Sequence, residues 1–76
     1  MIEAKVLPEY FIDVINGKKT FEIRKDRIDF KVGREVLLRE YSDGKYTGRV
    51  HKIKIKYVLR NCPQYGLMDG YCIIGF

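Results

Sequence analysis

The amino-acid sequence predicts a mostly β member of the α+β class, with one short helix after the first strand and strands that curl into a small barrel. Three observations lead to this prediction. The chain has 76 residues, which is enough for a single domain over residues 1–76 and too few for two. Apolar residues recur at helical spacing in one early segment, whereas most later segments alternate as strands do. In so small a domain, several strands protect their edges best by closing into a barrel or near-barrel.

The first strand and the helix follow each other directly. Residues 4–7 are short and alternate in polarity, which predicts a strand. A helix is predicted over residues 8–16, because Pro8 suits the first helical position, where its missing N–H costs nothing. Gly17 marks the end of this helix. Its apolar face consists of Phe11, Val14 and Ile15.

The remaining chain is predicted as strands and turns. Residues 20–24 alternate apolar and polar side chains, as a half-buried strand does. Residues 36–41 form the next strand, and the Asp43-Gly44 pair predicts a tight hairpin turn after it. The partner strand is predicted to run over residues 46–59. A loop over residues 61–66 and a last strand over residues 71–76 complete the fold.

The composition excludes several classes of protein. With 46% hydrophobic and 33% charged residues, the chain is typical of a folded globular domain. No apolar run approaches the roughly 18 residues of a membrane span, and no secretory signal is visible, so we expect a cytoplasmic protein without membrane contact. Cys62, Cys72 and the single histidine, His51, make no zinc-ligand set, so neither a metal nor a cofactor is predicted. Both thiols are expected to be reduced and to be buried or half-buried in the fold.

Positive charge is concentrated in two segments of this chain of net charge +5. Residues 17–34 hold seven Lys and Arg against three Asp and Glu, and residues 49–60 hold five against none. In the second segment, Lys52, Lys54 and Lys56 alternate with isoleucines and share one face of a strand. Their spacing of about 6.5 Å suits either a rail for a nucleic-acid backbone or a solvated face that resists aggregation.

A second group of charged residues lies in the first basic segment. Glu22 and Arg24 are two residues apart on a predicted strand and share a face, and Lys19 lies where the helix turns into that strand. They form either a structural ion pair or the floor of a polar pocket. In such a pocket Glu22 accepts hydrogen bonds from a base or amide edge, and the cations bind phosphate.

The six tyrosines, with no tryptophan, supply aromatic surface. Bases stack on such rings for about 1–3 kcal/mol each, although a small β-rich core also places tyrosines at its edges. Tyr65, in the loop after Pro63, is the candidate for an exposed ring that faces a ligand. Tyr57 shares the parity of Ile53 and Ile55 and is predicted to pack inward.

The octet GKKTFEIR at residues 17–24 fits the G-x-K-x-x-E-x-R signature of ASCH domains, small relatives of the PUA domain. Further runs agree in order along the chain: PEYF at 8–11, FKVG at 30–33, LREY at 38–41, YTG at 46–48 and the tail at 70–76. Over nearly its whole length the chain therefore resembles a compact ASCH subgroup of unknown function, frequent in bacterial and phage genomes.

The resemblance implies a PUA-like β-barrel and a cleft lined by Gly17, Lys19, Glu22 and Arg24. It also implies RNA or a nucleotide as the ligand. Some ASCH members are hydrolases of acylated cytidine or reported nucleases. The amidohydrolases combine the signature lysine, matched by Lys19, with a threonine and a final-strand glutamate. Those two positions hold Glu22 and Gly75, so the resemblance argues against this activity and gives Lys19 a catalytic role only if the protein is an enzyme.

Three functions therefore stay open, in this order: an RNA- or nucleotide-binding module, an accessory protein-interaction domain, and a hydrolase of a modified nucleoside or RNA. In the first, Lys19, Glu22 and Arg24 contact the ligand, with Gly17 and Tyr65 beside them, and the three lysines of residues 52–56 attract its backbone. An exposed apolar patch would favour the second, and the sequence shows none. Metal-independent hydrolysis that is lost in Lys19→Ala would identify the third.

Overall fold

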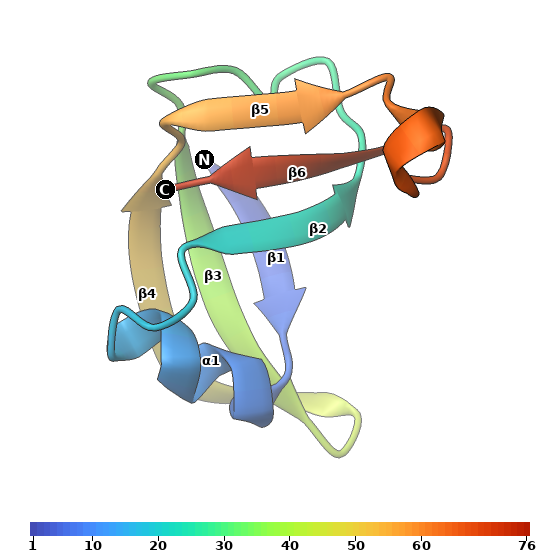
Figure 1. Ribbon diagram of the computed structural model, residues 1–76. Coiled ribbons are helices and arrows are strands. Elements are labelled where there is room, and N and C mark those ends of the chain that lie inside the picture. Colours follow the sequence, from blue (N-terminus) through green and yellow to red (C-terminus); the bar gives the residue numbers. More distant parts are fainter. The chain divides into compact units, whose positions relative to one another are not determined.

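The computed structural model describes all 76 residues, which form two compact units. Unit 1 comprises Met1–Thr20 and Glu35–Ile53, and unit 2 comprises Phe21–Arg34 and Lys54–Phe76. Each unit is therefore built from two separate stretches of the chain. Each contains one three-stranded sheet (Figure 1).

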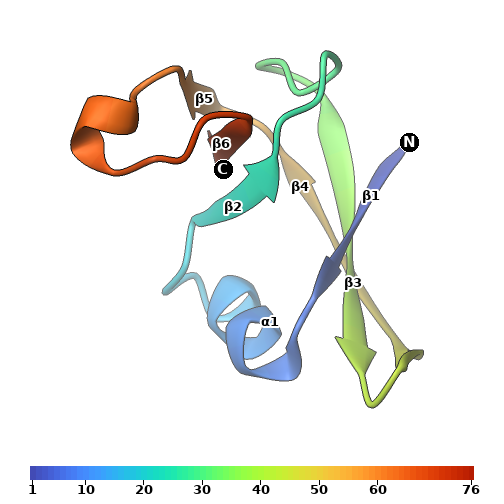
Figure 2. The ribbon, with the colours of Figure 1, turned by 90° about the vertical axis from the view of Figure 1, so that its right-hand side faces the viewer.

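Unit 1 contains the helix and the first sheet. Its elements are β1 (Ile2–Val6), α1 (Pro8–Ile15), β3 (Glu35–Ser42) and β4 (Lys45–Lys54), whose last residue, Lys54, belongs to unit 2. The strand β3 lies between β1 and β4 (Figure 1), and β1 runs parallel to it. The helix α1 follows β1 directly and contacts β3 (Figure 2). The buried apolar residues of this unit are Ile2, Ala4, Val6, Phe11, Val14, Val36, Leu38 and Ile53.

The local signals of unit 1 act as the sequence predicts. Pro8 opens α1, and Phe11 and Val14 of its predicted apolar face are buried, whereas Ile15 is 41% exposed and is the last residue of the helix. Gly17, with φ of 75°, lets the chain leave the helix, and its N–H donates to the Val14 carbonyl. Asp43 and Gly44 both have positive φ, which is the conformation of the tight turn that joins the hairpin β3–β4.

Unit 2 contains the second sheet. Its elements are β2 (Phe21–Lys25), β5 (Tyr57–Arg60), a short 3₁₀ turn η1 (Pro63–Tyr65) and β6 (Tyr71–Gly75). The strand β6 lies between β2 and β5 (Figure 1) and is antiparallel to both. The buried apolar residues are Phe30, Ile55, Cys62, Cys72 and Ile74. Both cysteines are free and buried, as the sequence predicts.

The predicted barrel is wrong. The strands form two separate three-stranded sheets, β1-β3-β4 and β2-β6-β5, without a closed barrel, so the fold is a mixed α+β arrangement of mostly strands with one short helix. The continuous strand over residues 46–59 is also wrong, because β4 ends at Lys54 and β5 begins at Tyr57. That break is where the chain passes from one sheet to the other.

Backbone hydrogen bonds explain the break. The N–H of Ile55 donates to the Arg34 carbonyl, and the Ile55 carbonyl accepts from the N–H of Gly33. The next N–H, of Lys56, donates to the Gly75 carbonyl and starts the pairing of β5 with β6. Tyr57 is therefore on a new strand, and it is 64% exposed instead of packed inward. As for membrane spans, the one α-helix has eight residues and is not long enough to cross a bilayer.

Candidate nucleic-acid interface

One face of the β2-β6-β5 sheet is largely apolar and exposed. We call it the aromatic face; it consists of Phe21, Ile23, Lys25, Tyr57, Leu59, Tyr71, Ile73 and Gly75. The strand register arranges these residues in three cross-strand rows: Phe21–Gly75–Tyr57, Ile23–Ile73–Leu59 and Lys25–Tyr71. All three aromatic side chains are exposed, and the face holds no acidic residue. The sheet thus presents rings and one lysine to solvent.

The opposite face of the same sheet holds the charged signature residues. Glu22 is buried, with 6% of its surface exposed, and lies 3.9 Å from the Arg24 guanidinium (Oε2 to Nη1). Along the next row, Arg24 lies across from Cys72, which in turn lies across from Arg60. Glu22 and Arg24 share a face, as the sequence predicts. Because that face is the buried one, the apolar residues of β2 face solvent.

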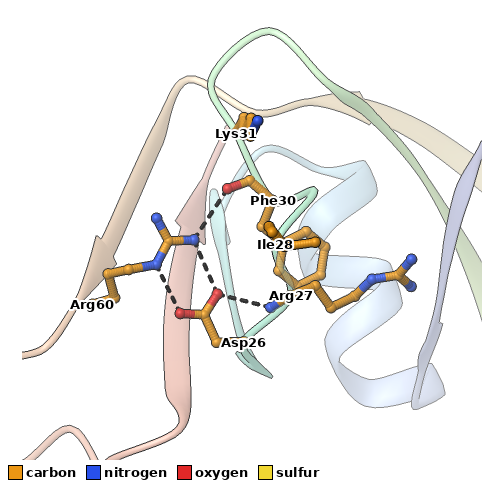
Figure 3. A pocket seen from close by; sticks show the side chains of 6 residues that line it. All are labelled: Asp26, Arg27, Ile28, Phe30, Lys31 and Arg60. Carbon is orange, nitrogen blue, oxygen red and sulfur yellow. Dashed lines mark hydrogen bonds and ion pairs between the residues drawn. The ribbon is translucent and has the colours of Figure 1, made fainter.

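A carboxylate–guanidinium pair anchors the loop that follows β2. Arg60 donates from Nε and Nη2 to the two oxygens of Asp26, at 2.7 and 2.9 Å, and from Nη2 to the Phe30 carbonyl at 3.1 Å (Figure 3). Asp26 also accepts from the N–H of Arg27. The hydrogen bonds from Arg60 hold the pKa of Asp26 below its usual range and favour the charged carboxylate.

The same residues border a hollow of about 350 Å³ in unit 2. Its lining consists of Asp26, Arg27, Ile28, Phe30, Lys31 and Arg60 (Figure 3). Two of its three cations are engaged by carboxylates, because Arg60 binds Asp26 and Arg27 binds both oxygens of Asp29 at 2.9 Å. We therefore interpret the hollow as part of the scaffold that shapes this loop. Ile28, which lies in the same loop, is 92% exposed.

The sequence matches the profile of a family described as "Domain of unknown function (DUF3850)" over residues 1–76. The chain belongs to the DUF3850 family. A search of curated proteins found no match.

The signature octet of this DUF3850 chain is divided between the two units. Gly17 and Lys19 belong to unit 1, and Glu22 and Arg24 belong to unit 2. In unit 1 the Lys19 Nζ lies 5.3 Å from the centre of the Tyr10 ring. This cation–π contact uses the charged ammonium of Lys19. The octet thus supplies a cation to unit 1 and an ion pair to unit 2.

The three lysines of residues 52–56 are exposed and alternate with buried isoleucines, as the sequence predicts. They do not lie on one strand, however. Lys52 and Lys54 belong to β4, where the Lys52 ammonium lies 3.5 Å from a Glu35 carboxylate oxygen. Lys56 lies between β4 and β5, and its N–H donates to the Gly75 carbonyl at 2.7 Å. Lys56 is therefore the lysine of this group that borders the aromatic face.

Of the predicted site residues, Tyr65 is exposed as expected, at 84%, in the turn η1. The residues that sequence reasoning missed are Phe21, Tyr57 and Tyr71 of the aromatic face. One signal was available in the run YVLR at residues 57–60. In a strand, Tyr57 and Leu59 share one face and Arg60 lies on the other, so the run indicates an apolar face that contains Tyr57. The sequence prediction extends one strand over residues 46–59, and it therefore places Tyr57 and Leu59 in the sheet of β4 instead of the sheet of β5.

Cys72 is a poor candidate for nucleophilic chemistry in this DUF3850 chain. Burial, helped by the nearby Asp26 carboxylate, raises the pKa of Cys72 to about 11. The thiol therefore stays protonated at neutral pH and is a weak nucleophile. No three or more His, Cys, Asp or Glu side chains gather as a metal site would require.

Charge is divided unevenly between the two units. Unit 2 holds eight Lys and Arg against four Asp and Glu, for a net charge of +4. Unit 1 holds seven against six, for a net charge of +1. The unit that exposes the aromatic face therefore also carries most of the positive charge of the chain.

Proposed function

We propose that this protein is a module that binds single-stranded RNA or a nucleotide, and that the aromatic face of unit 2 contacts the bases. The observation that carries the proposal is the coincidence, in one unit, of three exposed aromatic side chains on a sheet face and a net charge of +4. Single-stranded nucleic acids are bound by this combination, because the bases stack on rings and cations attract the phosphates.

The position of the lysines supports the same ligand. Lys25 lies on the aromatic face beside Tyr71, and Lys56 precedes Tyr57 and is exposed. Acidic side chains are missing from this face, so a phosphate backbone meets no like charge there. We also propose a cytoplasmic location, since the free Cys62 and Cys72 fit a reducing compartment.

The resemblance to ASCH domains supports the same class of ligand through other residues. We propose that Lys19 and Arg24 contact phosphate or a base, and that Glu22 accepts hydrogen bonds from a base edge. Arg24 has 30% of its side chain exposed and carries the planar fork that binds phosphate in two places. Replacing Glu22 by Gln should then change the preference among bases instead of weakening all sequences equally.

An amide NMR titration with a single-stranded RNA of about eight nucleotides tests the proposal. We expect shifts at Phe21, Tyr57 and Tyr71, and a Kd that rises steeply between about 50 mM and about 200 mM salt. Lys56→Gln should weaken binding to all sequences and lower the salt slope by about one. An RNA duplex of the same length is the control for attraction by charge alone. Equal affinity for the duplex, or shifts confined to residues 52–56 that salt removes, would contradict the proposal.

A second candidate function is protein docking, and one observation favours it. The middle row of the aromatic face, Ile23–Ile73–Leu59, is aliphatic, and Ile23 and Leu59 are exposed. Exposed apolar patches often mark protein interfaces. Sedimentation of the RNA-free protein distinguishes the two candidates. A self-association that Ile23→Ser abolishes would favour docking, whereas a monomer that binds RNA would favour the first function.

A further inference from the structure

Gly75 differs from every other glycine of the chain. The other six have positive φ values, between 75° and 95°, which favour glycine because it lacks a Cβ. Gly75 is the last residue of β6 and has no positive φ, and apart from its neighbours in the chain an added Cβ would come no closer than 3.5 Å to another atom, in this case the Cβ of Tyr57. Neither the backbone nor the packing requires a glycine there. Since glycine weakens a strand, its presence needs another reason.

The neighbours of Gly75 supply that reason. Phe21 lies directly across from it on β2, and Tyr57 lies directly across on β5. Residues opposite each other in antiparallel strands point to the same face, so the two aromatic side chains flank the missing side chain. Phe21 is 43% exposed and Tyr57 is 64% exposed. We call the space between them, with the Gly75 backbone as its floor, the Gly75 slot.

The spacing of the strands matches a flat ring. Phe21 and Tyr57 are two strands apart, or about 9.5 Å at the backbone. A ring that stacks between two others at van der Waals distance needs about 7–8 Å between their planes. The difference between these two spacings requires the two side chains to incline toward each other when a base is bound. A side chain at residue 75 would fill this space.

We propose that the Gly75 slot binds one nucleobase of a single-stranded RNA, stacked between Phe21 and Tyr57. This inference rests on the proposed function and adds the position and mode of base binding. Lys56, whose N–H donates to the Gly75 carbonyl, precedes Tyr57 in the chain and is exposed, and we expect its ammonium to attract the phosphate of the bound nucleotide. Tyr71 and Lys25 lie across from each other two rows away, about 13 Å along the strands, and offer a second ring beside a positive charge.

The charge of unit 2 favours a nucleic acid over a protein or a second copy of the chain in this slot. Two copies that meet face to face would bring together two units of net charge +4. Like charges oppose that contact, whereas a phosphate backbone is attracted to the same surface. A slot flanked by two aromatic side chains also fits a planar group better than an aliphatic side chain.

Gly75→Val gives the sharpest test, because it fills the slot while leaving both aromatic side chains and all charges in place. Valine also favours strands, so we expect the variant to fold at least as stably as the parent. Binding of a fluorescein-labelled single-stranded RNA is measured by anisotropy at about 50 mM salt. We expect Kd to rise about tenfold for Gly75→Val and for Tyr57→Leu, within the range for one lost base–aromatic stack. Tyr57→Phe, which keeps an aromatic ring at this position, should bind RNA with the Kd of the parent.

The matched control is Tyr46→Leu, which removes a half-exposed tyrosine from the sheet of unit 1. We expect its Kd to stay within about twofold of the parent. A direct readout comes from the ring protons of Tyr57, which a stacked base should shift upfield in the parent and not in Gly75→Val.

The failures of the two proposals are distinguishable. If the parent protein binds no RNA at low salt, the proposed function falls and the slot falls with it. If the parent binds RNA and Gly75→Val binds equally well, the Gly75 slot is wrong and the proposed function stands. A Gly75→Ala variant that gains stability without any change in Kd would show that Phe21 and Tyr57 only cover the glycine, and this would overturn the inference. A parent dimer that Gly75→Val disrupts would overturn it in favour of a second copy.

Discussion

The solvent-facing sides of the two sheets differ in the side chains they carry. In unit 1, the side of the sheet opposite the buried apolar residues is covered by its own ionic and aromatic contacts. Arg39 lies 3.6 Å from the Tyr46 ring centre and binds Glu3 at 3.1 Å, while Lys5 lies over the Tyr41 ring. In unit 2, the aromatic face presents rings and aliphatic side chains with Lys25 as the one charge.

The difference shows where each unit uses its charged residues. Unit 1 places the Arg39–Glu3 ion pair on its exposed side, next to the Tyr46 ring, and pairs the buried Glu40 with Arg49 on the other side. Unit 2 places ion pairs on the other side of its sheet and in the adjoining loop, through Glu22–Arg24 and Asp26–Arg60. Its exposed side is then left apolar. A surface kept apolar while charges are available nearby is typical of a binding surface.

The largest expected effect concerns the buried face that each of the two sheets has. Leu38 in unit 1 and Ile74 in unit 2 are both fully buried at the centre of their sheets. Each change to alanine should lower the free energy of unfolding by about 2–5 kcal/mol, through lost burial and the cavity left behind. Urea unfolding followed by circular dichroism measures both. A cost below about 1 kcal/mol at either position would contradict the assigned core.

The cysteines extend this test to the coupling between the units. Cys62 and Cys72 are both buried and both belong to unit 2, so thiol labelling reports the opening of that unit. If the units unfold together, Leu38→Ala in unit 1 should speed labelling as much as Ile74→Ala does. Labelling that responds to Ile74→Ala alone would show that the units open separately.

A middle-sized effect concerns the exposed sides. Arg39→Ala removes both the stacking on Tyr46 and the ion pair with Glu3, and should cost about 1 kcal/mol of stability. Leu59→Ala, on the aromatic face, should stay within about 0.5 kcal/mol, because that side chain covers nothing essential to the fold. Thermal unfolding compares them, with Arg39→Lys as the variant that keeps the charge. A larger cost for Leu59→Ala would make the aromatic face structural.

The smallest effect is the response of unit 2 to acid. Hydrogen bonds from Arg60 lower the pKa of Asp26, and hydrogen bonds from Arg27 lower that of Asp29. A carboxylate whose pKa is lower in the folded state than in the unfolded state stabilises the protein at pH values above its ordinary pKa of 3.8. This stabilisation is lost as the pH falls through the folded-state pKa. Urea midpoints between neutral pH and about pH 3 should show it. The difference in urea midpoint between the parent and Asp26→Asn should shrink at acid pH. A difference that stays constant with pH would argue against a stabilising Asp26–Arg60 pair.

Local signals predicted much of the fold. Pro8, Gly17 and the Asp43-Gly44 turn act through their own backbone conformations, so neighbouring residues suffice to identify them. The end of β4 could not be found this way, because Ile55 leaves the strand to hydrogen-bond Gly33 and Arg34, about twenty residues away in sequence. No glycine or proline marks that point. The missed break produced both the continuous strand and the inward placement of Tyr57.

The candidate site was harder to predict for a related reason. Alternation in β2 shows that two faces differ, but it does not say which one is buried. Apolar residues are usually inside, yet here Glu22 is buried and Phe21 is exposed. A charged residue can occupy the inner face when a partner such as Arg24 is within reach. Such pairing depends on the tertiary arrangement, which the alternation of a single strand does not contain.

The order of the strands along the chain has a consequence for biosynthesis. In unit 1 the central strand β3 is made before β4, so the whole sheet is available once residue 54 has left the ribosome. In unit 2 the central strand, β6, is the last to be made. Until it emerges, β2 and β5 lack the strand that pairs with both of them. The nascent chain therefore carries Phe21 and Ile23 on an unpaired strand from the synthesis of β2 until that of β6, and Tyr57 joins them late; until then this apolar segment is open to aggregation.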